Sequence, residues 1–349
     1  MQNTKRIYYL DVLRMIACFS VIMVHVSGRY VLNTSIKLNF MIGNICDSLS
    51  RIGVPIFLMI SGALFLEEKY DVKKISFHIR KMILFFSFWS LFYCFVYQLI
   101  PCFFRNKTID IGKIISSLIE GPAHLWYIYL IIGMYLITPL LRLWVNKKNI
   151  KYIEYFMCLA FIFSFLIPSI LSLITPFLDY SSSIETILYD KLYLNYVSGY
   201  TLYFILGWYL NNCEIRHKKF IFFLGILGFM YTIFTTFFLS YYFHKSILVY
   251  DYLSFNILIE SMSIFLFCKF WIENEKSKKN SSLVNSICKN SLNIYAVHLI
   301  FVDLFYFIAD KIGISHNSIL TIILVFFCTL ISSYFFSYLY YKTINIKGK

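Results

Sequence analysis

Apolar stretches of about 20 residues, the length that a helix needs to cross a bilayer, follow one another along the whole chain. Their apolar runs are unbroken rather than alternating, which favours helices over a β-barrel. We therefore expect an all-α polytopic membrane protein with about ten transmembrane helices. We also expect residues 1–349 to form a single integral-membrane domain with no soluble extension. The predicted spans are 8–27, 44–66, 80–101, 124–144, 152–171, 194–212, 220–240, 251–272, 287–309 and 318–341.

The composition excludes the main alternatives to a membrane protein. Hydrophobic residues make up 59% of the chain and charged residues only 14%, against about 25% charged residues in an average soluble domain. A soluble protein of this length could not bury so much apolar surface. The 20% aromatic content also excludes intrinsic disorder, because disordered chains are poor in aromatic residues.

The basic residues indicate how the chain is oriented in the membrane. The formal net charge is +14, and roughly two thirds of the 32 Lys and Arg residues fall at the two termini and in every second connection. By the positive-inside rule these segments are cytoplasmic, so both termini are expected inside. Membrane topology thus explains the basic excess, and we expect no nucleic-acid partner.

The familiar motifs of several other site classes are missing from the sequence. The nine cysteines and seven histidines show no zinc-ligand spacing, so we expect no metal site. There is no nucleophile elbow and no phosphate-binding glycine loop, which argues against a hydrolase and an ATP-driven pump. We expect no permanently bound cofactor.

The first span carries three ionisable residues that an apolar helix rarely tolerates. Asp11 and Arg14 are three residues apart, and His25 follows Arg14 by eleven. Eleven residues make about three helical turns, so Arg14 and His25 share a face and lie about 16 Å apart along the axis. Such residues usually face protein or a water-filled path. A structural interpretation stays open, in which Asp11 and Arg14 pair at the inner interface and His25 bonds a carbonyl at the outer one.

The spacing from Arg14 to His25 resembles a signature of the type-3 membrane acyltransferases, a family of multi-pass O-acyltransferases. That signature is a basic residue, ten intervening residues and a histidine. Less specific resemblances follow in order along the chain: SRIGVPIFLMISGALF (Ser50–Phe65), HLWYIYLIIGMYLITPLL (His124–Leu141) and IYAVHLI (Ile294–Ile300). The resemblance covers essentially the whole chain.

The resemblance implies an integral-membrane O-acyltransferase with an acyl-CoA donor in the cytoplasm. Acetyl is the commonest acyl group in the family, so acetyl-CoA is the expected donor substrate. The implied acceptor is a hydroxyl of a cell-surface or exported glycan, or of a lipid-linked sugar, so the activity would modify polysaccharide by O-acetylation. The frequent Lys, Ile, Asn, Phe and Tyr suggest an AT-rich, bacterial genome, and hence a bacterial cell membrane.

Three residues are the candidates for the catalytic roles. His25 would be the general base or would carry the acyl group itself, and the sequence does not separate the two. Arg14 would hold the donor through a phosphate or along its pantetheine arm. Arg51, in the outer third of the second span, would stabilise the oxyanion or orient the acceptor. Pro55 lies four residues later, cannot bond the Arg51 carbonyl, and loosens the helix there.

Further ionisable and aromatic residues are candidates for substrate binding. They are Asp11, His124, Trp126, Tyr127, Glu260 and His298. An interfacial aromatic belt also explains Trp126 and Tyr127. Glu260 and His298 have a structural interpretation as well, in which they pair with each other or with Arg51.

A secondary transporter that exports a glycan precursor is the alternative function. Buried charges suit a transporter equally well. Transporters often have repeated halves with helices broken at matching positions, and the sequence shows neither.

Overall fold

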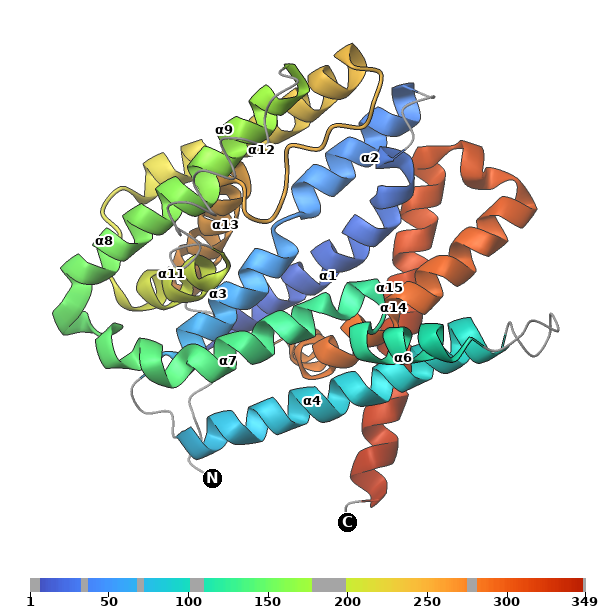
Figure 1. The fold of residues 1–349 in the computed structure, drawn as a ribbon, viewed down its shortest axis with the longest axis horizontal. Coiled ribbons are helices and arrows are strands. Elements are labelled where there is room, and N and C mark those ends of the chain that lie inside the picture. The colour runs from blue at the N-terminus through green and yellow to red at the C-terminus, as the bar shows by residue number, and fades with distance from the viewer. Residues whose placement is uncertain are drawn as a thin grey trace. The chain divides into compact units, whose positions relative to one another are not determined.

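The structure is a computed structural model that describes residues 7–32, 37–67, 72–100, 110–177, 199–274 and 281–347. Every regular element in these ranges is helical (Figure 1). Nine helical segments among them are long and apolar enough to cross a membrane, which confirms an all-α polytopic membrane protein. The predicted span 194–212 corresponds to α11 (Thr201–Asn212), and residues 194–198 lie outside the described ranges.

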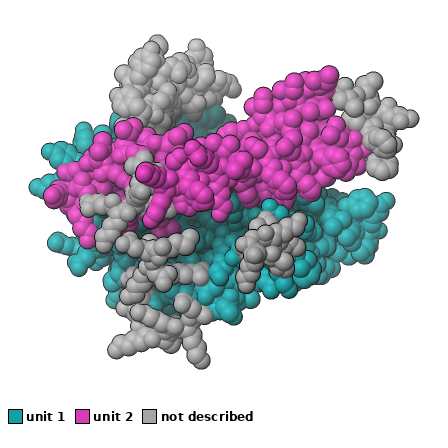
Figure 2. Space-filling view, turned by 90° about the horizontal axis from the view of Figure 1, so that it is seen from below, with its two compact units in different colours: residues 1–63, 151–349 teal, residues 64–150 magenta. Residues whose placement is uncertain are grey.

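The chain divides into two compact units, residues 1–63 with 151–349 and residues 64–150 (Figure 2). The helices mainly in the first unit are α1 (Tyr8–Val31), α2 (Lys37–Ser50), α3 (Gly53–Phe65), α8 (Ile150–Phe161), α9 (Ile167–Ile174), α11, α12 (Lys218–Tyr242), α13 (Phe255–Asn274), α14 (Ser282–Ile312) and α15 (Ser318–Lys347). The second unit holds α4 (Val72–Cys94), α6 (Ile111–Glu120) and α7 (Trp126–Trp144).

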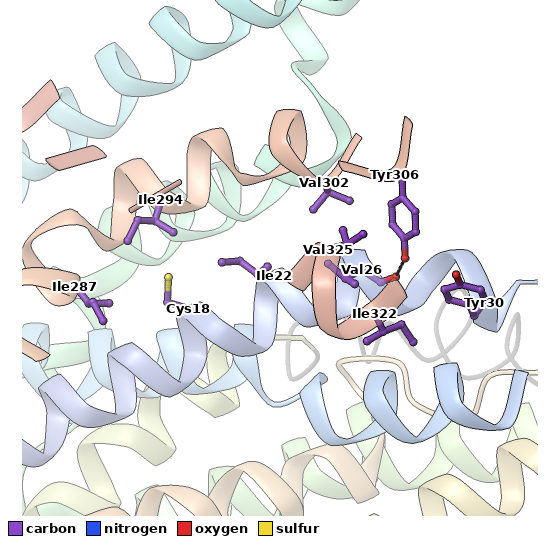
Figure 3. Close-up of a cluster of buried hydrophobic side chains, with 10 residues drawn as sticks. All are labelled: Cys18, Ile22, Val26, Tyr30, Ile287, Ile294, Val302, Tyr306, Ile322 and Val325. Carbon is purple, nitrogen blue, oxygen red and sulfur yellow. Dashed lines mark hydrogen bonds between the residues drawn. The ribbon is translucent and has the colours of Figure 1, made fainter. Parts of the chain in front are cut away.

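Helix α1 packs against α2, α13, α14 and α15. One side of it carries small and branched apolar residues four apart, which is the spacing that places side chains on one helix face. These residues form a buried cluster with residues of α14 and α15, and the Tyr306 hydroxyl donates to the Val26 carbonyl within it (Figure 3). The cluster contains Cys18, Ile22, Val26, Tyr30, Ile287, Ile294, Val302, Tyr306, Ile322 and Val325.

The second predicted span is interrupted at Arg51. Helix α2 ends at Ser50 and α3 begins at Gly53, and this segment starts at Lys37 rather than at residue 44. Pro55 has no N–H to donate to the Arg51 carbonyl, and the first bond of the new helix runs from the Ile56 N–H to the Ile52 carbonyl. The helix that Pro55 was predicted to loosen is therefore interrupted, and the break falls at the intramembrane cation.

Helices α3 and α11 meet backbone to backbone at two glycines. A Cβ on Gly62 would overlap the carbonyl of Phe204, and a Cβ on Gly207 would overlap the carbonyl of Met59. Small residues allow this close approach between membrane helices. The contact fixes the position of α3, and therefore the point at which the helix resumes after Arg51.

In the second unit, α6 occupies a connection for which the sequence predicted no helix. The Asp110 side chain caps this helix by accepting from the Lys113 N–H at 3.2 Å. That hydrogen bond lowers the pKa of the Asp110 carboxyl, because it favours the charged form. Gly121 ends α6 with a φ of 68°, a conformation that glycine adopts without steric cost.

Replacing Gly207 with Ala is expected to destabilise the fold strongly. The added methyl must displace the Met59 backbone, and overpacking of this kind costs about 3 kcal/mol or more. The measurement is the thermal unfolding midpoint of the detergent-solubilised protein. Gly133→Ala is the matched control, because Gly133 is also helical and has open space around its Cβ position. Equal midpoints for the two variants would contradict the backbone crossing.

Candidate functional site

The uninterrupted α1 helix carries the candidate residues at two levels. It runs from Tyr8 to Val31 without a break, so Arg14 and His25 lie about three turns and 16 Å apart on one face, as their spacing predicts. Arg14 belongs to a group of polar residues that we call the inner cluster. His25 belongs to a second group, the outer cluster.

The inner cluster is built around Asp11, which is almost completely buried. Arg14 Nη1 lies 3.4 Å from Asp11 Oδ1, and the Arg14 side chain is 28% exposed. The Cys288 thiol donates to the Asp11 carbonyl, which ties this end of α1 to α14. Lys269 of α13 donates to two carbonyls in the last turn of α11, those of Leu210 and Asn211, at 2.8 and 2.9 Å. Two cations thus stand at the end of the bundle predicted to be cytoplasmic.

In the outer cluster, His25 stands next to a second histidine. Its ring centroid lies 5.0 Å from that of His298 on α14. His298 is fully buried, and its Nδ1 lies 2.6 Å from the carbonyl of Tyr295. A carbonyl can only accept, so Nδ1 of His298 carries the proton of that bond. The structure therefore brings together two histidines that are 273 positions apart in the chain.

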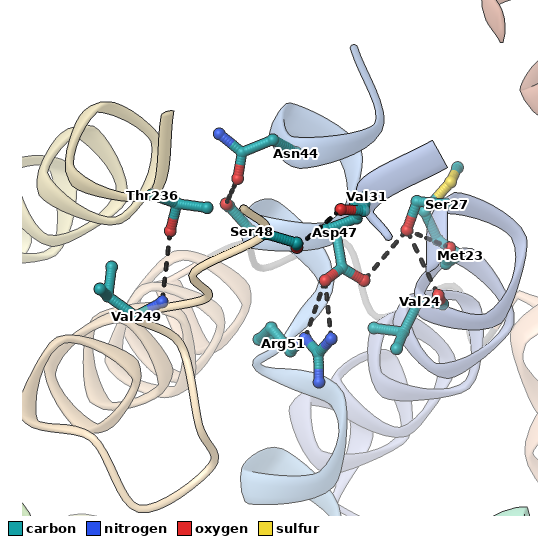
Figure 4. A network of polar contacts seen from close by, with 11 residues as sticks. Met23, Val24, Ser27, Val31, Asn44, Asp47, Ser48, Arg51, Thr236 and Val249 are labelled. Carbon is teal, nitrogen blue, oxygen red and sulfur yellow. Dashed lines mark hydrogen bonds and ion pairs between the residues drawn. The ribbon is translucent and has the colours of Figure 1, made fainter. Parts of the chain in front are cut away.

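An ion pair at the helix break completes the outer cluster (Figure 4). Arg51 donates from Nε and Nη2 to Asp47 Oδ2, at 3.1 and 2.7 Å. The other oxygen of Asp47 accepts from the Ser27 hydroxyl of α1 at 3.0 Å. The Asp47 side chain is fully buried and that of Arg51 is 20% exposed. Both charged groups interact electrostatically with His25.

Two tyrosines cover the Arg51 guanidinium. Its carbon lies 4.7 Å from the ring centroid of Tyr250 and 5.6 Å from that of Tyr252, both in residues 243–254 between α12 and α13. Cation–π contacts of this kind stabilise a desolvated guanidinium. Burial raises the pKa of both phenols, which keeps them protonated.

Hydrogen bonds from three helices hold residues 243–254 in place. The Val249 N–H donates to Thr236 of α12, and Asn256 of α13 donates to the Val249 carbonyl. Tyr203 of α11 donates to the Tyr252 carbonyl at 2.7 Å. The rings above Arg51 are thus fixed by the surrounding fold.

Glu260 lies in this supporting layer and is not paired with Arg51 or His298. Its Oε1 is 2.6 Å from the hydroxyl of Thr232 on α12, and Asn256 donates to the same hydroxyl. Glu260 is fully buried. These contacts fit a structural role, in which Glu260 supports the segment that covers Arg51.

Apolar packing separates the two clusters along α1. Cys18 and Ile22 are buried against α14, and a Cβ on Gly53 would contact the Ala17 carbonyl and the side chain of Val21. The face that joins Arg14 to His25 is therefore filled with side chains. A ligand that reaches both clusters has to pass beside this packed segment.

The remaining predicted residues belong to the second unit. His124 is buried in a short 3-10 turn, with its ring 5.0 Å from that of Tyr93 on α4. Trp126 and Tyr127 begin α7 and are half-buried. Within this unit, His124 packs against the aromatic ring of Tyr93.

A comparison with protein families assigns residues 7–341 to the acyltransferase 3 family, described as an acyltransferase domain. The chain belongs to the acyltransferase 3 family. The resemblance seen in the sequence is thereby confirmed over nearly the whole chain, and this protein is a multi-pass membrane acyltransferase. Searches of curated proteins and of solved structures gave no match.

The outer cluster holds an imidazole pair and a guanidinium, groups that are suited to proton transfer and to hydrogen bonding with an oxyanion. Imidazole can take or give a proton near neutral pH, and a guanidinium has five N–H donors, of which Asp47 takes two. Among the residues that the structure describes, no three His, Cys, Asp or Glu side chains are grouped so as to hold a metal.

Sequence analysis of this acyltransferase missed Asp47, although a signal was present. Asp47 lies four residues before Arg51, within the predicted span 44–66. An acid one helical turn from an intramembrane cation is the natural partner for it. Tyr250 and Tyr252 carried no such signal, because they reach Arg51 from about 200 residues away in the chain.

The Asp47–Arg51 pair is expected to show strong energetic coupling in a double-mutant cycle with Asp47→Asn and Arg51→Gln. Each single change leaves a buried group without its partner, which costs about 3–5 kcal/mol, while the double change removes both. The measurement is SDS-induced unfolding of the purified protein. The matched control is the bidentate ion pair Arg29–Asp310, whose side chains are each 44% exposed. Its coupling energy should be close to zero, because solvent screens exposed pairs. Equal coupling in the two cycles would contradict the buried pair.

Proposed function

We propose that this acyltransferase moves an acetyl group from cytoplasmic acetyl-CoA to a hydroxyl of a glycan or lipid-linked sugar at the outer face of a bacterial cell membrane. One observation carries the proposal. His25 lies beside His298 and the Asp47–Arg51 pair, and Arg14 stands three turns away on the same helix face.

The donor side of the proposal rests on the inner cluster and the basic inner segments. Arg14 would bind a phosphate or polar group of the donor, and the lysines and arginines on the predicted cytoplasmic side would attract its phosphates. The pantetheine arm would span the roughly 16 Å between Arg14 and His25. Because residues 17–22 are packed, this arm would run beside α1 rather than between α1 and α14.

The chemical step follows from the groups at the outer cluster. His25 takes the proton of the acceptor hydroxyl as its oxygen attacks the thioester carbonyl, and Arg51 donates to the oxyanion that forms. The tetrahedral intermediate then expels the CoA thiolate, which takes the proton back from His25. The products are an acetyl ester and free CoA. His298 would hold the imidazole of His25 in position.

His25 could alternatively take the acetyl group itself and pass it to the acceptor. An acid-sensitive label on the protein distinguishes the two routes. Purified enzyme incubated with labelled acetyl-CoA in the absence of acceptor would retain label only on the acyl-imidazole route. Direct transfer leaves the protein unlabelled.

A secondary transporter of a glycan precursor is the competing proposal. The break at residues 51–52 is the feature that favours it, since transporters place binding sites at interrupted helices. The acyltransferase family membership favours the enzyme.

Replacing His25 with Ala is expected to abolish acetyl transfer from labelled acetyl-CoA to membrane acceptors. Loss of a general base costs about 100-fold or more in rate. The measurement is incorporation of label by membranes that contain equal amounts of each variant. His217→Ala is the matched control, because His217 is exposed just before α12. Full activity in His25→Ala would remove His25 from its role.

Deleting the gene is expected to leave the amount of surface glycan normal and to remove acetyl from it. Mass spectrometry of the isolated glycan would then show a loss of about 42 Da per modified unit, the mass of an acetyl group less the hydrogen it replaces. Loss of the surface glycan itself would support export instead. Restoring the wild-type gene, but not the His25→Ala variant, should return the acetyl groups.

A further inference from the structure

A cavity of about 400 Å³ lies within the first unit, on one side of residues 243–254. Its opposite wall comes from the span that contains α8 and α9. The lining includes three hydroxyl side chains of that span, together with a carboxylate and a hydroxyl of the connection: Ser164, Ser169, Ser172, Asp251 and Ser254. None of these residues was identified from the sequence as a site residue.

The connection contributes side chains both to this cavity and to the cover over Arg51. Val249, Asp251 and Leu253 line the cavity, whereas the rings of Tyr250 and Tyr252 lie over Arg51. Residues 251–254 form a turn, in which the Ser254 N–H donates to the Asp251 carbonyl and the Leu253 N–H donates to Asp251 Oδ1. A ligand in the cavity would therefore press against the segment that covers the outer cluster.

The helix that forms the other wall is irregular at the cavity. A π-helical turn occupies Ile162–Leu166, between α8 and α9, and Pro168 follows it. Pro168 has no N–H to offer the Ser164 carbonyl one turn earlier, and both residues line the cavity. Single π turns within α-helices are frequent at functional sites.

The polar groups of the lining mainly accept hydrogen bonds. Asp251 is a carboxylate, and the Ser254 and Ser169 hydroxyls already donate to the carbonyls of Asp251 and Phe165. The Ser169 oxygen also accepts from the Phe255 N–H at 3.1 Å, and a hydroxyl oxygen has two lone pairs, so it can accept one further hydrogen bond. The lining residues include no Lys or Arg, so nothing in the described wall favours an anion. Leu248, Val249 and Leu253 add apolar surface.

A neutral sugar ring has the properties that this lining requires. Its hydroxyls donate to carboxylate and hydroxyl oxygens, and its C–H face packs on aliphatic side chains. The volume is at the lower end of small-molecule pockets, which suits one or two sugar rings. An anionic ligand would meet the Asp251 carboxylate without a compensating cation.

We propose that this cavity is a subsite for a neutral sugar unit of the acceptor. The inference rests on the proposed function for its biological role, whereas the binding itself does not depend on catalysis. The subsite holds one sugar unit of the acceptor chain and leaves the reacting hydroxyl to the neighbouring unit at the outer cluster. The connection carries Asp251 on one face and the tyrosines over Arg51 on the other, so it links the two positions.

Binding can be measured by hydrogen–deuterium exchange on the full chain in lipid nanodiscs, which avoids detergents with sugar headgroups. The probes are methyl glucoside and methyl N-acetylglucosaminide at tens of millimolar, with methyl glucuronide as the anionic counterpart. We expect either neutral glycoside to slow exchange in residues 164–172 and 248–254. We expect the glucuronide to have no effect there.

Asp251→Asn tests the carboxylate. In the wild type the Leu253 N–H donates to Asp251 Oδ1. Asn keeps an oxygen that can accept this hydrogen bond, so the turn should be retained. The concentration of neutral glycoside that gives half-maximal protection should rise about tenfold, which corresponds to loss of a charge-assisted hydrogen bond. Asp110→Asn is the matched control, because Asp110 is an exposed carboxylate in the other unit and Asn is an equally good helix cap.

Transfer assays separate failure of the subsite from failure of the proposed function. If the subsite is correct, Asp251→Asn raises the KM for glycan acceptor about tenfold and leaves that for acetyl-CoA unchanged. Active transfer with unchanged acceptor KM, or glycoside protection that survives Asp251→Asn, would overturn the subsite alone. Absence of label transfer by the wild type would overturn the proposed function, and the exchange experiment would then decide on sugar binding by itself.

Discussion

A guanidinium within a membrane segment needs a partner, and the Asp47–Arg51 pair meets that need at the point where the second span breaks. The pair forms because Asp47 and Arg51 are four residues apart and so lie one helical turn from each other. It also ties three parts of the fold together. Asp47 accepts from Ser27 of α1, and Arg51 lies under two tyrosines of the connection before α13. The position of His25 follows from these contacts.

Hydrogen bonds at the two residues that follow His25 in α1 hold it in position. Ser27 joins the helix to α2 through Asp47, and the Val26 carbonyl accepts from Tyr306 of α14. These bonds fix the rotation of α1 and hold the imidazole beside His298. An acid–base group that must meet both a thioester and a hydroxyl needs such fixed geometry, since small misplacements are costly in rate.

Local sequence patterns predicted the features that arise from interactions within one segment of the chain. Apolar length predicted the spans, and the helical repeat placed Arg14 and His25 on one face of α1. Pro55 predicted weakness at Arg51, although the full break of the helix was not foreseen. The α6 helix was missed because its residues were assigned to a connection on the basis of span length alone.

Contacts between distant segments were beyond these patterns. The pairing of His25 with His298 and the covering of Arg51 by Tyr250 depend on how α1, α14 and the α12–α13 connection pack. For Glu260, too, sequence patterns could not show which residues its side chain contacts. Its charge suggested a site, but its contacts with Thr232 place it in the support of that connection. Burial of an ionisable group marks importance without saying whether the group acts or supports.

The connection of residues 243–254 illustrates how one segment can both support the outer cluster and line a cavity. One of its faces covers the cation of the outer cluster, the other lines the hydroxyl-rich cavity, and its backbone is held by α11, α12 and α13. A segment held so firmly cannot adapt its shape to each ligand. Specificity for an acceptor would then reside in the few side chains that it presents to the cavity, Asp251 foremost, while the chemistry on the other face stays the same. Separate faces of one short segment would thus allow the acceptor to change without disturbing His25 and Arg51.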